Sequence, residues 1–191
     1  MWYYYIYYGS LIVLIPGIIF AFIAQIMVGA TYKKYSKTDA RSGWTADDMS
    51  RMFMERYDCN GVVVRPIEGE LTDNYNPSTD VLSLSEGVYG KSSISALGVA
   101  AHECGHARQQ GSFMMKLRSF LVPVTNIGSR LAVPVAILGI ILEWLLGGAG
   151  ATNAGTYILC IGVILYSLST VFALITLPVE IGASAKAMTM L

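Results

Sequence analysis

Charged side chains are scarce in this chain of 191 residues. Asp, Glu, Lys and Arg make up 14% of it, whereas about 25% is usual in soluble globular proteins. Thirteen basic and thirteen acidic residues leave no net charge, so no global electrostatic field is available to gather a nucleic acid. We therefore expect no nucleic-acid partner. With 54% hydrophobic residues, the composition excludes a disordered chain and argues against a purely soluble one.

Cysteine is also rare. Cys59, Cys104 and Cys160 are widely spaced, and Cys160 falls in a long apolar tract, so no disulfide framework is predicted. The first ten residues contain no Lys or Arg, unlike the basic start of a secretory signal peptide. We therefore expect the first apolar tract to be retained as a membrane span.

Three long apolar tracts predict three transmembrane helices. They are residues 11–30, 131–150 and 157–179. Twenty residues at 1.5 Å rise per residue cover about 30 Å, the thickness of the hydrocarbon core of a bilayer. Glu143 is the only charged residue in these tracts. Trp2 and the tyrosines within residues 3–8 precede the first tract and resemble an aromatic belt at the membrane surface.

The charged residues are concentrated between the first and second tracts. Residues 31–130 hold twelve of the thirteen basic and eleven of the thirteen acidic side chains. Basic residues follow the first tract and precede the second, so the positive-inside rule predicts that this charged domain is cytoplasmic. The short linker of residues 151–156 makes the last two spans a hairpin. We divide the chain into four segments. They are the aromatic leader with the first span (residues 1–30), the charged domain (31–130), the hairpin of the last two spans (131–179) and the segment that begins with Glu180 (180–191).

The polar domain is predicted to be of the α+β class. Thr45, three residues before Asp48, is typical of a helix N-cap, and this helix is expected to end near residue 58. Residues 62–67 and 81–85 have the β-branched or alternating pattern of short strands. Ser92 or Ser93 is expected to cap a second helix that ends near residue 110.

The second helix carries the motif that indicates chemistry. His102, Glu103 and His106 form an HExxH pattern, and the two histidines are the only ones in the chain. Residues four apart on a helix share one face, with Cβ atoms about 5–6 Å apart. Two imidazoles at this spacing can bind one Zn²⁺, and a glutamate between them can act as general base on an attacking water. The alternative is a pair of structural histidines beside a solvated glutamate.

A third protein ligand must come from elsewhere in the chain. No histidine remains, so a carboxylate is required. Glu180 ends the third apolar tract, and the hairpin returns it to the side of His102 and His106. Asp73 and Glu86 are the fallbacks. A carboxylate that merely marks the edge of the membrane is the alternative for Glu180.

The sequence also resembles a known family. It is similar to the YugP-type neutral zinc metallopeptidases of bacterial membranes and, more distantly, to the HtpX-type and related membrane gluzincins. The resemblance covers nearly the whole chain and rests on residues 71–77 (LTDNYNP), 81–85 (VLSLS), 98–107 (GVAAHECGHA), 117–123 (LRSFLVP) and 176–180 (TLPVE).

The resemblance implies a small gluzincin-like domain anchored by about three transmembrane helices. It implies zinc held by His102, His106 and Glu180, with Glu103 as the catalytic base. Gluzincins often carry Asp where this chain has Ser184. The strand at residues 81–85 could then be an edge strand that pairs with an extended substrate, or an interior strand of the sheet.

Other polar residues have functional and structural interpretations. The Tyr75 hydroxyl, close to Asp73, could stabilise an oxyanion, although a structural tyrosine in a turn is the preferred interpretation. Arg118 could steer substrate, but basic residues beside a membrane more often meet lipid headgroups. Cys104 is expected to be a small buried residue that points away from the metal.

These expectations favour a membrane-embedded zinc endopeptidase that cleaves membrane or misfolded proteins in protein quality control. Its partners would be a protein or peptide substrate and the lipid bilayer. The alternative is a catalytically inactive metal-binding subunit that acts as a structural partner in a membrane protein complex.

Overall fold

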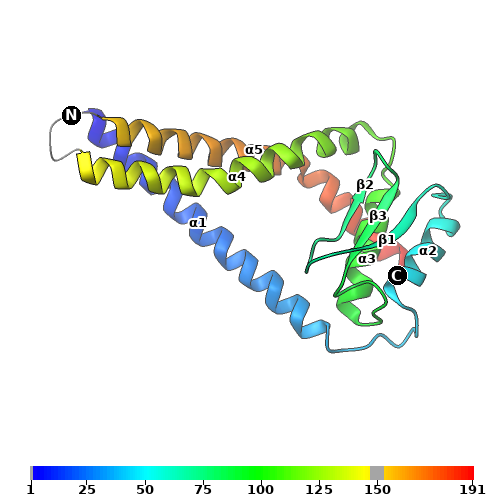
Figure 1. The fold of residues 1–191 in the computed structure, drawn as a ribbon. Coiled ribbons are helices and arrows are strands. Elements are labelled where there is room, and N and C mark those ends of the chain that lie inside the picture. The colour runs from blue at the N-terminus through cyan, green and yellow to red at the C-terminus, as the bar shows by residue number, and fades with distance from the viewer. Residues whose placement is uncertain (1, 147–152) are drawn as a thin grey trace. The chain divides into compact units, whose positions relative to one another are not determined.

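The computed structural model describes residues 2–146 and 153–191, which form five helices and one three-stranded sheet (Figure 1). The helices are α1 (Trp2–Tyr35), α2 (Ala46–Arg56), α3 (Ile94–Ala107), α4 (Phe113–Leu146) and α5 (Ala154–Met190). The strands are β1 (Val63–Ile67), β2 (Asn74–Asn76) and β3 (Val81–Ser85). The chain divides into two compact units. Unit 1 is Met1–Ile26 with Phe120–Ile175, and unit 2 is Met27–Ser119 with Thr176–Leu191.

Three of the described helices are long and apolar enough to cross a membrane. They are Tyr5–Tyr35 in α1, Phe113–Leu145 in α4 and Ala154–Met190 in α5. The prediction of three candidate membrane helices is therefore confirmed. The predicted end of the second span and the start of the linker, residues 147–152, lie outside the described residues, as do the side chains of the predicted aromatic belt at residues 2–4.

In unit 1, α4 and α5 approach closely at glycines. A Cβ atom on Gly139 would collide with the backbone of Leu159, and one on Gly155 would collide with the backbone of Glu143. The Glu143 carboxylate accepts hydrogen bonds from the backbone N–H and the hydroxyl of Thr156, at 2.9 and 3.0 Å. Glu143 therefore caps the first turn of α5, where free N–H groups favour a negative charge.

In unit 2, β3 is the central strand of the sheet. The order is β1-β3-β2, with β1 parallel and β2 antiparallel to β3. Of the two interpretations of residues 81–85, the edge strand is thus wrong and the interior strand is confirmed. The free edges of this sheet belong to β1 and β2. Strand β2 was not predicted from the sequence, because its three residues are too few to show a periodic pattern.

Local capping fixes the two short helices of unit 2. The Thr45 side chain accepts a hydrogen bond from the Asp48 N–H at the start of α2. The Ser93 side chain accepts one from the Ala96 N–H at the start of α3. Both helices begin where the sequence predicts, because each cap satisfies a backbone donor that has no partner within the helix.

The core of unit 2 joins elements that are distant in the sequence. Phe53 of α2, Leu82 and Leu84 of β3, and Ala100 of α3 are buried in one apolar cluster. Val179 of α5 belongs to the same cluster. Because Val179 is anchored in this core, the next residue, Glu180, is held against the face of α3.

Candidate metal centre

Helix α3 presents its two histidines from neighbouring turns. The ring centroids of His102 and His106 lie 4.7 Å apart in an edge-to-face arrangement. The His106 side chain is completely buried, whereas 30% of the His102 side chain is exposed. One side of the pair is therefore closed by protein, and the other is open to an incoming molecule.

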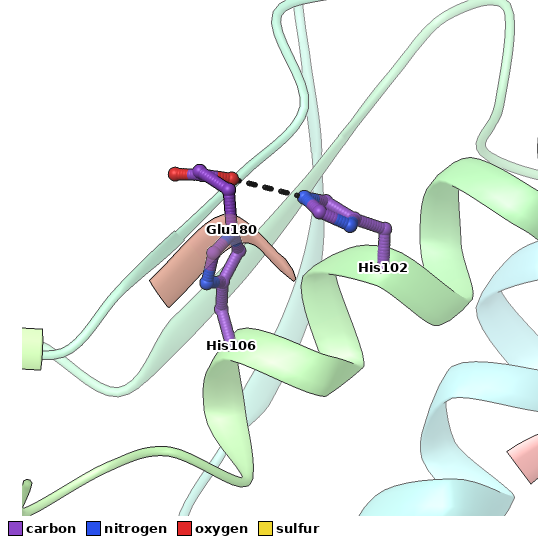
Figure 2. Close-up of side chains that lie close together, drawn as sticks. All are labelled: His102, His106 and Glu180. Atoms are coloured by element: carbon purple, nitrogen blue, oxygen red, sulfur yellow. Dashed lines mark ion pairs between the residues drawn. The ribbon is translucent and has the colours of Figure 1, made fainter. Parts of the chain in front are cut away.

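Helix α5 brings the Glu180 carboxylate to this pair (Figure 2). Its Oε2 atom lies 3.3 Å from Nε2 of His102 and 3.2 Å from Nε2 of His106. Candidate ligand atoms of the three residues all lie within 4.8 Å of one another. Among the described residues, no other group of three His, Cys, Asp or Glu side chains could hold a metal ion. All three residues belong to unit 2.

The chemistry of these three residues fits a zinc ion. Two imidazoles and one carboxylate are a donor set of catalytic zinc sites, which leave a fourth position open. Neither ring nitrogen of His106 has a hydrogen-bond partner of good geometry among the described residues, although both atoms are buried. Burying a polar atom without a partner is costly. A cation bound at Nε2 would remove part of that cost.

Two further side chains hold the ligands in place. Arg118 donates a hydrogen bond from Nε to Oε1 of Glu180 at 2.7 Å, which leaves Oε2 directed at the histidines. The hydroxyl of Ser184 lies 3.2 Å from Nδ1 of His102. If Nε2 of His102 binds a metal, Nδ1 carries the ring proton and donates a hydrogen bond to the Ser184 hydroxyl. The second ring nitrogen of a metal-bound histidine commonly donates a hydrogen bond of this kind.

Neither of these two roles was predicted from the sequence. Arg118 was expected to steer substrate or to meet lipid headgroups, and it instead forms an ion pair with Glu180. Ser184 stands where gluzincins often carry Asp, and its hydroxyl takes the position beside His102. No local pattern identifies the partner of either residue, because Arg118 and Glu180 are 62 positions apart and Ser184 and His102 are 82 apart.

Glu103 is buried next to the histidines, with 8% of the residue exposed. Its Oε2 atom has no hydrogen-bond partner among the described residues. Burial raises the pKa of Glu103, while the nearby His106 and His102 oppose that shift. A buried carboxyl group with a raised pKa beside a possible metal site is a candidate general base.

The remaining candidate residues do not belong to the cluster of His102, His106 and Glu180. The Tyr75 hydroxyl donates to Asp80 Oδ1 at 2.8 Å, so Tyr75 has a structural partner, but it lies in strand β2 and not in the turn that was expected. Asp73 accepts hydrogen bonds from the N–H and the hydroxyl of Ser85, and Glu86 is exposed. Burial raises the pKa of Cys104 to about 12, so this thiol is neither a ready ligand nor a nucleophile.

Gly105 sets the separation of α3 and α5. A Cβ atom at this position would collide with the backbone carbonyl of Ala183. By contrast, a Cβ atom on Gly98, in the same helix, would meet nothing within 4 Å. Gln109, in the turn after α3, makes a second contact with α5, because its side-chain NH₂ donates to the Val179 carbonyl at 3.0 Å.

Adding one methyl group at these two glycines should have opposite effects on stability. Gly98→Ala should stabilise unit 2 by roughly 0.5–1 kcal/mol, because alanine favours the helix. Gly105→Ala should destabilise it by about 1–3 kcal/mol, because the helices must separate. Thermal unfolding of both variants in detergent measures the difference. Equal shifts would contradict the close contact of Gly105 with Ala183.

Comparison with known proteins places the chain in a family. A family model described as "Putative neutral zinc metallopeptidase" matches residues 10–191. The chain is 41% identical over 169 residues to a protein of Bacillus subtilis (strain 168) named "Putative membrane protease YugP", covering 87% of this chain and 70% of that protein. No solved structure matches it significantly. The chain therefore belongs to the family that carries this description, and the three long apolar helices among its described residues support a membrane protein.

Proposed function

We propose that this chain is a membrane-embedded zinc endopeptidase that hydrolyses peptide bonds of membrane or misfolded proteins. One observation carries the proposal. The Glu180 carboxylate lies 3.3 and 3.2 Å from the Nε2 atoms of His102 and His106, although Glu180 follows both histidines by more than 70 positions in the sequence. Family membership supports the same reaction class. The gluzincin-like character of the domain is part of this proposal.

His102, His106 and Glu180 would hold the zinc ion. When bound, zinc polarises a scissile carbonyl and makes water a stronger nucleophile at neutral pH. Arg118 would hold Oε1 of Glu180 and thereby keep Oε2 aimed at the metal. Ser184 would keep the His102 ring in the tautomer that leaves Nε2 free to bind. These two contacts fix the ligands before the metal arrives.

Glu103 would be the residue that moves protons. Its carboxylate takes a proton from the water that attacks the carbonyl and then gives that proton to the leaving amine. Burial and the open side of the histidine pair support this role. Burial raises the pKa of Glu103, which favours a carboxylate that takes up a proton and then releases it.

Strand β2 would position an extended substrate. It is one of the two free edges of the described sheet, and the backbone of Tyr75 in this strand lies close enough to Glu103 to hydrogen-bond with its carboxylate. A peptide paired along this edge would gain affinity from main-chain hydrogen bonds, largely independent of its sequence. We assign this role to β2 in place of β3.

We further propose that the site faces the cytoplasm. Lys33, Lys34 and Lys37 follow the apolar part of α1, and the positive-inside rule places such residues on the cytoplasmic side. A peptidase in that position, attached to the bilayer, is suited to the quality control of membrane proteins. The three domain boundaries, after residues 30, 130 and 179, belong to the same proposal.

Metal removal tests the function. The purified protein, reconstituted in vesicles, should cleave an unfolded membrane-anchored reporter, lose this activity with a chelator, and regain it when zinc is restored. Equal cleavage with and without the chelator would contradict a zinc peptidase. Zinc bound at about one ion per chain without any cleavage would instead support the inactive metal-binding subunit.

A further inference from the structure

Unit 2 contains an open apolar groove of about 540 Å³, called the cavity below, that the proposed reaction does not yet use. This volume is typical of pockets that take up small molecules or several side chains. In the described part of the chain, no charged side chain lines it. Its walls come from the last turns of α1, the start of α3 and the loop before β2; they include Met27, Val28, Tyr32, Leu71, Ser95 and Val99.

The cavity and the metal centre share one face of α3. Ser95, Val99 and His102 follow one another at spacings of four and three residues, which places them in a single row along the helix. At 1.5 Å rise per residue, Val99 lies only about 4.5 Å from His102 along the helix axis. The cavity therefore begins one helical turn from the exposed imidazole.

The α1 wall of the cavity is held in place by a defined contact. The Tyr32 hydroxyl donates to the carbonyl of Gly87 at 3.1 Å, and a Cβ atom on Gly87 would collide with that hydroxyl. Met27 and Val28 lie on the same helix, which is a candidate membrane span. One wall of the cavity is thus formed by a membrane helix.

Leu71, which also lines the cavity, has an unusual backbone conformation. Its φ of 53° lies in the left-handed region, which L-residues other than Gly, Asn and Asp seldom adopt. The turn around it is braced, because Thr72 donates a hydrogen bond to the Glu68 carbonyl. A strained leucine that lines a cavity near a reactive centre suggests that its side chain is needed there.

We propose, on the basis of the function proposed above, that this cavity binds a bulky apolar side chain of the substrate next to the scissile bond. A substrate side chain is favoured over a lipid because the cavity follows the row of residues that leads to His102. The substrate class is then apolar polypeptide segments, such as those exposed by unfolded membrane proteins. Leucine or phenylalanine at this position should be cleaved at least about tenfold faster than alanine.

Two substitutions remote from the metal ligands test the preference. Val28→Trp should fill the cavity and lower kcat/KM for the leucine and phenylalanine peptides by about tenfold or more, while alanine peptides change little. Leu71→Gly should weaken the same preference without loss of folding stability, because glycine accepts a positive φ. The matched control is Ser42→Trp, which lines a different cavity in unit 2 and should leave the preference unchanged.

Cross-linking provides a measurement that does not depend on catalysis. A peptide that carries a photoreactive leucine analogue is bound to the Glu103→Gln variant in vesicles and irradiated. Cross-links to Met27, Val28 or Leu71 are expected, and Val28→Trp should abolish them. Cross-links only to other residues would overturn the proposal, as would a phospholipid that is retained by the purified protein and displaced by Val28→Trp.

The two proposals can fail separately. If wild-type protein and Glu103→Gln cleave equally, the proposed catalytic function is wrong, and the cross-links still decide what the cavity binds. If cleavage depends on Glu103 but shows no preference for bulky apolar residues, the assignment of the cavity is wrong while the peptidase remains.

Discussion

A Glu103→Gln variant is expected to bind about one zinc ion per chain and to lose proteolytic activity by about 100- to 10,000-fold, the usual contribution of a general base. Glutamine has nearly the same volume as glutamate, so the packing of α3 should survive. It has no basic oxygen that can take a proton from water. Because Glu103 is not among the three clustered ligand residues, metal content and activity should separate in this variant.

The measurement compares zinc content and reporter cleavage for the same preparations. Glu55→Gln is the matched control, since Glu55 is an exposed glutamate of α2 and its change should leave both quantities at the wild-type level. Cleavage by Glu103→Gln at the wild-type rate would rule out Glu103 as the base. A loss of zinc together with activity would indicate a ligand role for Glu103.

A Glu180→Gln variant should lose both zinc and activity. Replacing the carboxylate removes the only anionic donor of the cluster and breaks the ion pair with Arg118. Residues that merely support a metal ligand contribute about 10- to 100-fold to metal affinity, so loss of a ligand should weaken zinc binding by more than about 100-fold. Equilibrium dialysis against buffered zinc gives the affinity directly.

Glu86→Gln is the control for this variant, because Glu86 was a fallback ligand and is exposed. It should retain the affinity of the wild-type protein. Unfolding of Glu180→Gln must be followed in parallel, since Arg118 is left without its carboxylate partner. A folded Glu180→Gln variant with unchanged zinc affinity would exclude Glu180 as a ligand and return the third position to another carboxylate.

The local features of the fold follow from the sequence. Thr45 and Ser93 cap their helices because the side chain and the backbone donor lie three residues apart. The pairing of His102 with His106 depends only on helical periodicity. The three apolar tracts are identified by length and hydrophobicity. In each case the interacting groups are neighbours along the chain, so a pattern of a few residues is sufficient.

The features that the sequence did not reveal depend on distant contacts. The central position of β3 results from its pairing with β1 and with the three-residue β2, and a strand that short has no periodic pattern. The contact of Gly105 with Ala183 follows from the way α3 crosses α5. Glu180 was predicted as a candidate because it ends an apolar tract, but nothing local indicates that Arg118 and Ser184 would hold the ligands.

The location of Glu180 on α5 has a consequence for biosynthesis. A ribosome completes α3 more than seventy residues before it reaches this glutamate. With the proposed ligand set, a nascent chain holds only two of the three zinc-binding side chains until α5 has been made and has packed against Gly105. Translation order would thus delay the appearance of hydrolytic activity, and a newly made copy could not digest its neighbours at the translocon.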